Sequence, residues 1–122
     1  LPFSLTYVVV HFVHAFSPFQ IFATEGTKLA SALHALSDQV HDDDKPLLVL
    51  EAEKLISMCK ELHITAKASA QGKSATFTKV DACILKTRNV MTLLCQLLPL
   101  CSKILRKSLE NHVTNMTFLE SK

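Results

Sequence analysis

Histidine and cysteine are the residue types in this sequence with the greatest capacity for chemistry. Two pairs have spacings that metal ligands use on a helix: Cys59 with His63, and His11 with His14. Neither pair belongs to a Cys-x-x-Cys or His-Glu-x-x-His pattern. We therefore favour core packing of Cys59 with His63 beside it, and we predict no metal and no cofactor.

Nucleophilic catalysis is the second chemistry that the cysteines suggest. Cys95 and Cys101 lie in an apolar helical pattern with no activating group nearby in the sequence, so inert packing is the better interpretation. A phosphate-binding loop is also missing, because Gly26 and Gly72 are isolated. We predict no catalytic residue and expect a protein that is not an enzyme.

The cysteine positions also bear on the redox compartment. Any two-disulfide pairing must join two of Cys83, Cys95 and Cys101, which share one helical region. At about 1.5 Å rise per residue, Cys95 and Cys101 are about 9 Å apart in a continuous helix, and a disulfide needs Cα atoms within about 7 Å. Only a chain reversal near Pro99 would join them. We therefore predict reduced cysteines and a cytoplasmic or nuclear location.

Composition favours one helical domain. The 122 residues are 48% hydrophobic and 20% charged, and two glycines are too few for the many tight turns of an all-β domain. The net charge of +2 is too even for a nucleic-acid surface.

The segment 17–40 has the clearest helical pattern. Ser17, Pro18 and Gln20 form a capping signal at its start. Its apolar stripe alternates three and four residues apart and includes a glycine: Phe19, Phe22, Gly26, Leu29, Leu33, Leu36 and Val40. Gly26 has two interpretations, close approach of another helix or a tolerated defect, between which the sequence does not decide.

The segment 47–70 predicts a second helix. The acidic run 42–44 and Pro46 suit its N-terminus, and Gly72 suits a left-handed position after its end. The acidic run has neither the glycine nor the distal glutamate of a calcium loop, so we assign it to capping. The apolar stripe again has heptad spacing: Leu48, Ala52, Leu55, Cys59, Leu62, Ala66 and Ser69.

The segment from Lys79 onwards predicts a third apolar stripe, and Thr78 with Asp81 marks its start. The stripe comprises Val80, Ile84, Thr87, Met91, Leu94, Leu98, Cys101 and Leu105. Its register continues across Pro99, which allows one long kinked helix or a break that opens a fourth helix. A helix of ~40 residues would reach about 60 Å, far beyond its neighbours, so we predict the break.

Residues 1–16 form an uncharged apolar segment that we interpret as an additional helix. A secretory signal is the alternative for this segment, and the sequon at Asn115 would then gain meaning. Polar residues interrupt the apolar run, so no membrane span is predicted.

The predicted fold is an all-α, up-and-down four-helix bundle over residues 17–122, with the additional apolar segment 1–16. Long amphipathic helices with small residues on buried faces resemble the four-helix modules of cytoskeletal and adhesion scaffolds, such as the vinculin, catenin and focal-adhesion-targeting bundles. This resemblance of architecture implies a protein-interaction module.

The leading functional interpretation is an adaptor or scaffold module that binds an amphipathic partner helix in a groove between its helices. Apolar anchors are expected off the main stripes, and a basic rim beside them. The candidate residues are Val49, Ile56, Leu97, Lys103, Arg106 and Lys107. The alternative function is a secreted four-helix ligand of cytokine type. No sequence feature specifies the oligomeric state.

Overall fold

Three helices joined by two short loops make up the region that the structure describes. The computed structural model describes residues 16–120, in which three helices are α2 (Ser17–Ser37), α3 (Lys45–Lys67) and α4 (Lys73–Glu120). No strand occurs within this range. The predicted all-α class is confirmed. The predicted helix or signal over residues 1–16 falls, apart from Phe16, outside the described residues.

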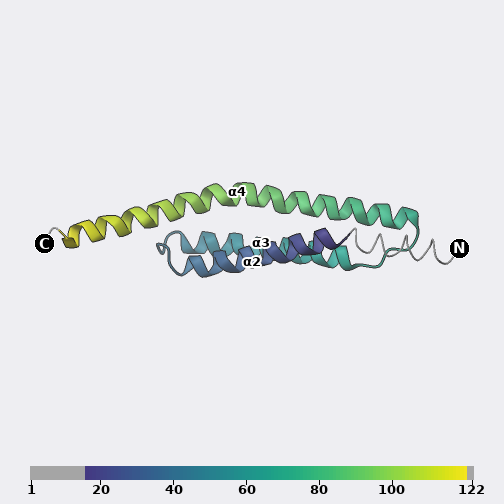
Figure 1. Ribbon diagram of the computed structural model, residues 1–122, viewed down its shortest axis with the longest axis horizontal. Helices are drawn as coiled ribbons and strands as arrows, with labels where there is room; N and C mark the ends of the chain where they lie inside the picture. The colour runs from purple at the N-terminus through teal and green to yellow at the C-terminus, as the bar shows by residue number, and fades with distance from the viewer. Residues whose placement is uncertain (1–15, 121–122) are drawn as a thin grey trace.

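Helices α2 and α3 form an antiparallel hairpin, and α4 lies along it (Figure 1). Proline occupies the first turn of both α2 and α3, where its missing N–H would have had no helical acceptor. The predicted capping box at Ser17 is wrong: Phe16 is the N-cap residue of α2 and makes no side-chain cap hydrogen bond.

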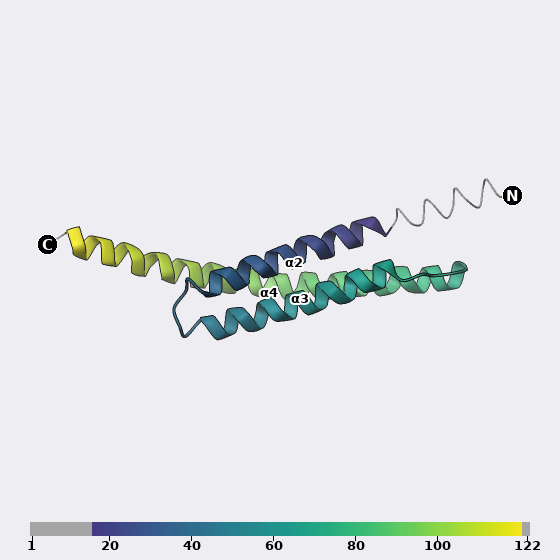
Figure 2. The same cartoon turned by 90° about the horizontal axis from the view of Figure 1, so that it is seen from below.

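Helix α4 continues through Pro99, which corrects the predicted break and the four-helix topology. Pro99 is exposed and α4 is bowed, so the ring and the missing N–H are accommodated on the outer side of the helix (Figure 1). The compactness argument failed because the C-terminal part of α4 extends past the α2–α3 turn in both views (Figures 1 and 2).

The start of α4 also differs from the sequence prediction. Gly72 has a φ of 87°, which confirms the predicted left-handed position. The helix begins directly after it, at Lys73, so Thr78 lies inside α4 and does not cap it. The Thr78 hydroxyl instead donates to the Ser74 carbonyl oxygen at 3.0 Å.

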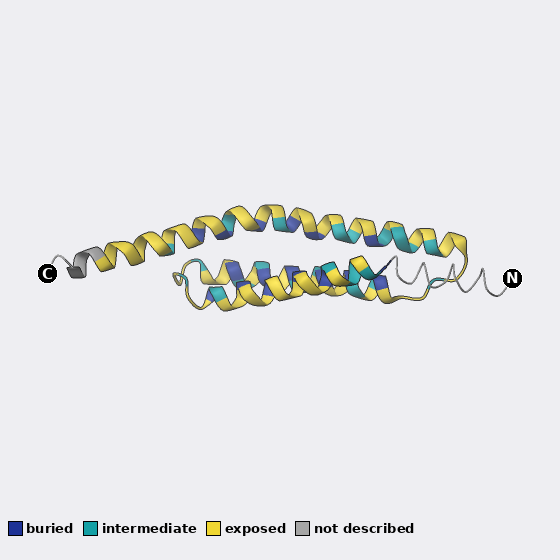
Figure 3. Ribbon diagram, viewed as in Figure 1, coloured by how far each residue is buried: buried dark blue, intermediate teal, exposed yellow. Residues whose placement is uncertain are grey.

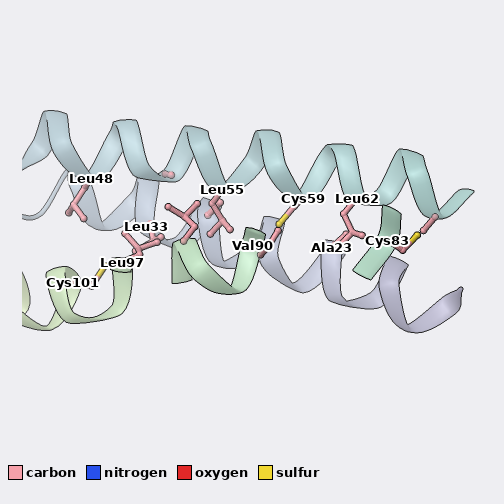
Figure 4. Packing of buried hydrophobic residues seen from close by; sticks show 14 of the residues in the cluster. Ala23, Leu33, Leu48, Leu55, Cys59, Leu62, Cys83, Val90, Leu97 and Cys101 are labelled. Atoms are coloured by element: carbon pink, nitrogen blue, oxygen red, sulfur yellow. The ribbon is translucent and has the colours of Figure 1, made fainter. Parts of the chain in front are cut away.

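The core is built on α3. Six of the seven residues in the predicted α3 stripe are fully or almost fully buried, from Leu48 to Ala66, whereas Ser69 is exposed. Figure 4 shows Leu33 of α2, Leu55 of α3 and Val90 of α4 pointing into the space between the helices. Because small and large side chains alternate along this stripe, α3 can pack against both of its neighbours.

Gly26 lies at a close approach of α2 to α3. A Cβ atom at this position would overlap Cys59 Sγ, and both residues are buried. Of the two interpretations that the sequence left open, the structure supports close helix approach.

Helix α4 packs on the hairpin with a different face from the predicted one. Its buried residues are Cys83, Val90, Leu93, Leu97, Cys101 and Ile104. Only Cys101 belongs to the predicted stripe, whose other members are half-buried or exposed. The apolar surface of α4 is therefore wider than α2 and α3 cover.

Candidate partner-binding surface

Four large apolar side chains at seven-residue intervals form an exposed line along α4. They are Ile84, Met91, Leu98 and Leu105, with 39%, 46%, 57% and 47% of their surface exposed. We call these four residues the α4 ridge. Residues seven apart lie on the same side of a helix. The exposed side of α4 is visible along its length in Figure 3.

The α4 ridge is continuous with the core. Val80, Thr87 and Leu94 are half-buried and lie between the ridge and the buried face. Leu98 is one residue after the buried Leu97, which places it about 100° around the helix. A helix in a four-helix bundle contacts two neighbours on adjacent sides. The apolar surface of α4 has the width for one more helix beside the hairpin, which the described residues do not supply.

The charges in the middle of α4 are all of one sign. Between Asp81 and Glu110 the sequence contains five basic residues and no acidic one: Lys86, Arg88, Lys103, Arg106 and Lys107. Lys86 pairs with Glu61 at 3.7 Å, and Lys107 pairs with Asp44 at 3.5 Å, so two of the five cations bind α3 and its N-terminus.

Three cations remain available for other partners. Arg88, Lys103 and Arg106 are exposed and form no ion pair with the side chains that the structure describes, residues 16–116. Arg88 and Arg106 are 18 residues apart, which is five helical turns, so both lie on the same side of α4 at the outer margin of the ridge. Their separation along the axis is about 27 Å.

The structure separates the residues that the sequence singled out. Val49 and Ile56 are half-buried on α3, and Lys103, Arg106 and Lys107 are exposed on α4. Leu97 is only 1% exposed and packs in the core, which corrects its expected role as a surface anchor. The reason is that α4 is rotated about its own axis relative to the predicted orientation. The predicted stripe would have placed Leu97 on the solvent side and Leu98 in the core.

Exposed apolar residues also continue along α4 after the ridge. They include Leu109 and Met116. Where the turn meets α4, a shallow depression of about 210 Å³ is lined by residues that include His41, Asp44 and Lys107. Its small size and open shape suit water rather than a buried ligand.

Neither metal chemistry nor a membrane span is found in the described part of the chain. No group of three or more His, Cys, Asp or Glu side chains there could hold a metal ion. His11 and His14 lie outside the described residues. None of the helices from α2 to α4 is long and apolar enough to cross a membrane.

The four cysteines differ in exposure. All four are unbonded in the structure, with Cys59, Cys83 and Cys101 buried and Cys95 exposed. Burial raises the pKa of each buried thiol, and for Cys83 the nearby Lys79 and Lys86 oppose that effect. A raised thiol pKa favours the uncharged form, which suits packing and not nucleophilic attack.

The three buried thiols are expected to make the free energy of unfolding depend on pH in the alkaline range. In the unfolded chain they ionise near their ordinary pKa of 9.0, whereas in the folded chain they hold their protons to higher pH. The free energy of unfolding is therefore expected to fall as the pH rises past about 9. Urea denaturation at pH 7 and pH 10 measures this fall, and Cys59→Ala is expected to reduce it. Cys95→Ser, the exposed control, is expected to leave it unchanged.

Taken together, the fold and the surface define an all-helical architecture, over the residues described, with an uncovered apolar helix face. Over 108 residues, or 84% of the chain, the sequence is 49% identical to α-catulin of Homo sapiens and equally to α-catulin of Pongo abelii. It is 44% identical over 111 residues to α-catulin of Mus musculus. The chain spans 14% of the length of these curated relatives. No family model and no solved structure matches it.

Proposed function

We propose that this chain is a non-enzymatic adaptor or scaffold module that binds an amphipathic partner helix along the α4 ridge. The observation that carries the proposal is the exposure of four large apolar side chains, Ile84, Met91, Leu98 and Leu105, at heptad spacing. A partner helix that packs on this side of α4 would complete a four-helix arrangement.

The similarity to α-catulin supports a scaffold or adaptor role over an enzymatic one. The four unbonded cysteines support a reducing, cytoplasmic location. The secreted cytokine-like alternative gains no support from the relatives that the chain matches. Val49 and Ile56 remain proposed as secondary contacts on α3.

The test uses a fluorescently labelled synthetic peptide that forms an amphipathic helix, with leucine at heptad positions and glutamine on its flanks. We expect the natural chain to bind this neutral peptide in an anisotropy titration, and Leu98→Asp to weaken binding about tenfold or more. Ile64→Asp is the matched control, because Ile64 is equally exposed, at 59%, but lies on α3.

Two results would contradict the proposal. One is equal loss of binding in Leu98→Asp and Ile64→Asp, which would mean nonspecific hydrophobic association. The other is no peptide binding by a chain that sediments as a dimer and becomes monomeric in Leu98→Asp, because a second copy would then occupy the ridge.

A further inference from the structure

The cations beside the α4 ridge are an independent feature of this surface. For 28 residues after Asp81, α4 contains no carboxylate, although the whole chain has 11 acidic and 13 basic residues. A solvent-exposed helix commonly pairs opposite charges three or four residues apart. Helix α4 has no such pair in this stretch, since every charge there is positive.

The partners of these cations separate them into two groups. Lys86 and Lys107 bind Glu61 and Asp44, and thereby hold α4 against α3 and its N-terminus. Arg88 lies about 160° around α4 from Lys86, and Arg106 about 100° around from Lys107. Both arginines are next to the ridge and have no ion pair with the side chains that the structure describes, residues 16–116. Their positive charge is thus unbalanced where a helix packed on the ridge would lie.

We propose that the helix bound by the α4 ridge is acidic, with carboxylates on its flank that meet Arg88 and Arg106. This inference rests on the proposed function and adds the charge of the partner. Guanidinium groups bind carboxylates in a planar, two-bonded geometry. Carboxylates about 18 residues apart on a partner helix would match the spacing of the two arginines. Lys103, on the same stretch, adds to the positive potential.

A second copy of this chain fits the surface less well. It would bring another Arg88 and Arg106 to the same margin, and like charges across an interface oppose association. An acidic helix instead neutralises the margin while its apolar side covers the ridge.

The experiment uses two further versions of the neutral peptide, one with glutamate and one with lysine in place of the flanking glutamines. We expect the natural chain to bind the glutamate peptide about 5- to 20-fold more tightly than the neutral one, from two partly exposed ion pairs. The lysine peptide is expected to bind more weakly than the neutral one. The preference for glutamate is expected to shrink as salt is raised.

Charge reversal supplies the decisive comparison. In the double variant Arg88→Glu, Arg106→Glu, the order of affinities is expected to invert, so that the lysine peptide binds best. The matched control is Lys60→Glu, Lys67→Glu, which changes the net charge equally at two exposed residues of α3 and is expected to keep the natural order.

The outcomes distinguish this inference from the docking proposal. If the three peptides bind equally well and Leu98→Asp weakens all of them, the ridge binds helices but the acidic preference is wrong. If Leu98→Asp has no effect on any peptide, the docking proposal fails. Binding of phosphatidylserine vesicles through Arg88 and Arg106, with no preference for the glutamate peptide, would overturn the inference in favour of a membrane surface.

Discussion

Replacing Leu97 by alanine is expected to lower the free energy of unfolding by about 2–5 kcal/mol, whereas the same change at the next residue, Leu98, is expected to alter it by less than about 0.5 kcal/mol. Leu97 is 1% exposed and Leu98 is 57% exposed. The first change leaves a cavity among packed side chains, and the second removes a side chain that already contacts water.

Urea denaturation followed by far-ultraviolet circular dichroism measures both values on the same scale. The pair is informative because the two residues are adjacent and chemically identical, so that helix propensity and composition cancel. A larger loss for Leu98 than for Leu97 would mean that α4 packs on the hairpin with the face that the sequence stripe predicted.

Gly26→Ala is expected to lower the free energy of unfolding by up to about 2 kcal/mol, against the usual helical preference for alanine. Alanine in place of glycine inside a helix normally gains about 1 kcal/mol. Here the added methyl group would overlap the buried Sγ of Cys59, and overpacking of a core costs about 1–3 kcal/mol.

The double-mutant cycle with Cys59→Ala isolates this contact. Once the sulfur atom is removed, Gly26→Ala is expected to stabilise the protein, so the sign of its effect reverses between the two backgrounds. A stabilising effect of Gly26→Ala in both backgrounds would show that α2 and α3 do not approach closely at this point.

The sequence predicted best where one helix face carries all of the packing. Helix α3 lies between two neighbours, and its stripe from Leu48 to Ala66 is the buried one. The glycine on the α2 stripe was open to two interpretations, close helix approach or a tolerated defect, and only the structure decides between them. The prediction for α3 depends on local periodicity, which a single sequence contains.

The errors concern α4, where the outcome depends on what surrounds the helix. Periodicity locates an apolar surface but not the part of it that neighbouring helices cover, and α4 is apolar over more than one face. The predicted stripe combined the exposed ridge with half-buried residues such as Leu94, and it left Leu97 outside. Pro99 was predicted to break the helix on an assumption of compactness, but α4 extends beyond its neighbours.

For the candidate surface, the exposure of the basic residues was predictable from the sequence, and the identity of the exposed apolar residues was not. Lys103 and Arg106 are exposed, as a basic margin requires. The ridge residues were assigned to the core because an apolar side chain at heptad spacing is usually buried. The sequence did contain a signal for the open side of α4. No carboxylate occurs between Asp81 and Glu110, so the positive charges of this stretch are not balanced on the helix itself.

The central claim is that α4 is one helix with a buried face and an open face, and thiol reactivity tests it most directly. Cys83 and Cys101 are buried on one side of α4, and Cys95 is exposed on another. With a maleimide reagent, followed by peptide mass spectrometry, we expect Cys95 to react rapidly in the native protein. Cys83, Cys101 and Cys59 are expected to react only after denaturation. Rapid native labelling of Cys83 and Cys101 with protection of Cys95 would contradict the account, because it would place the opposite face of α4 against the hairpin.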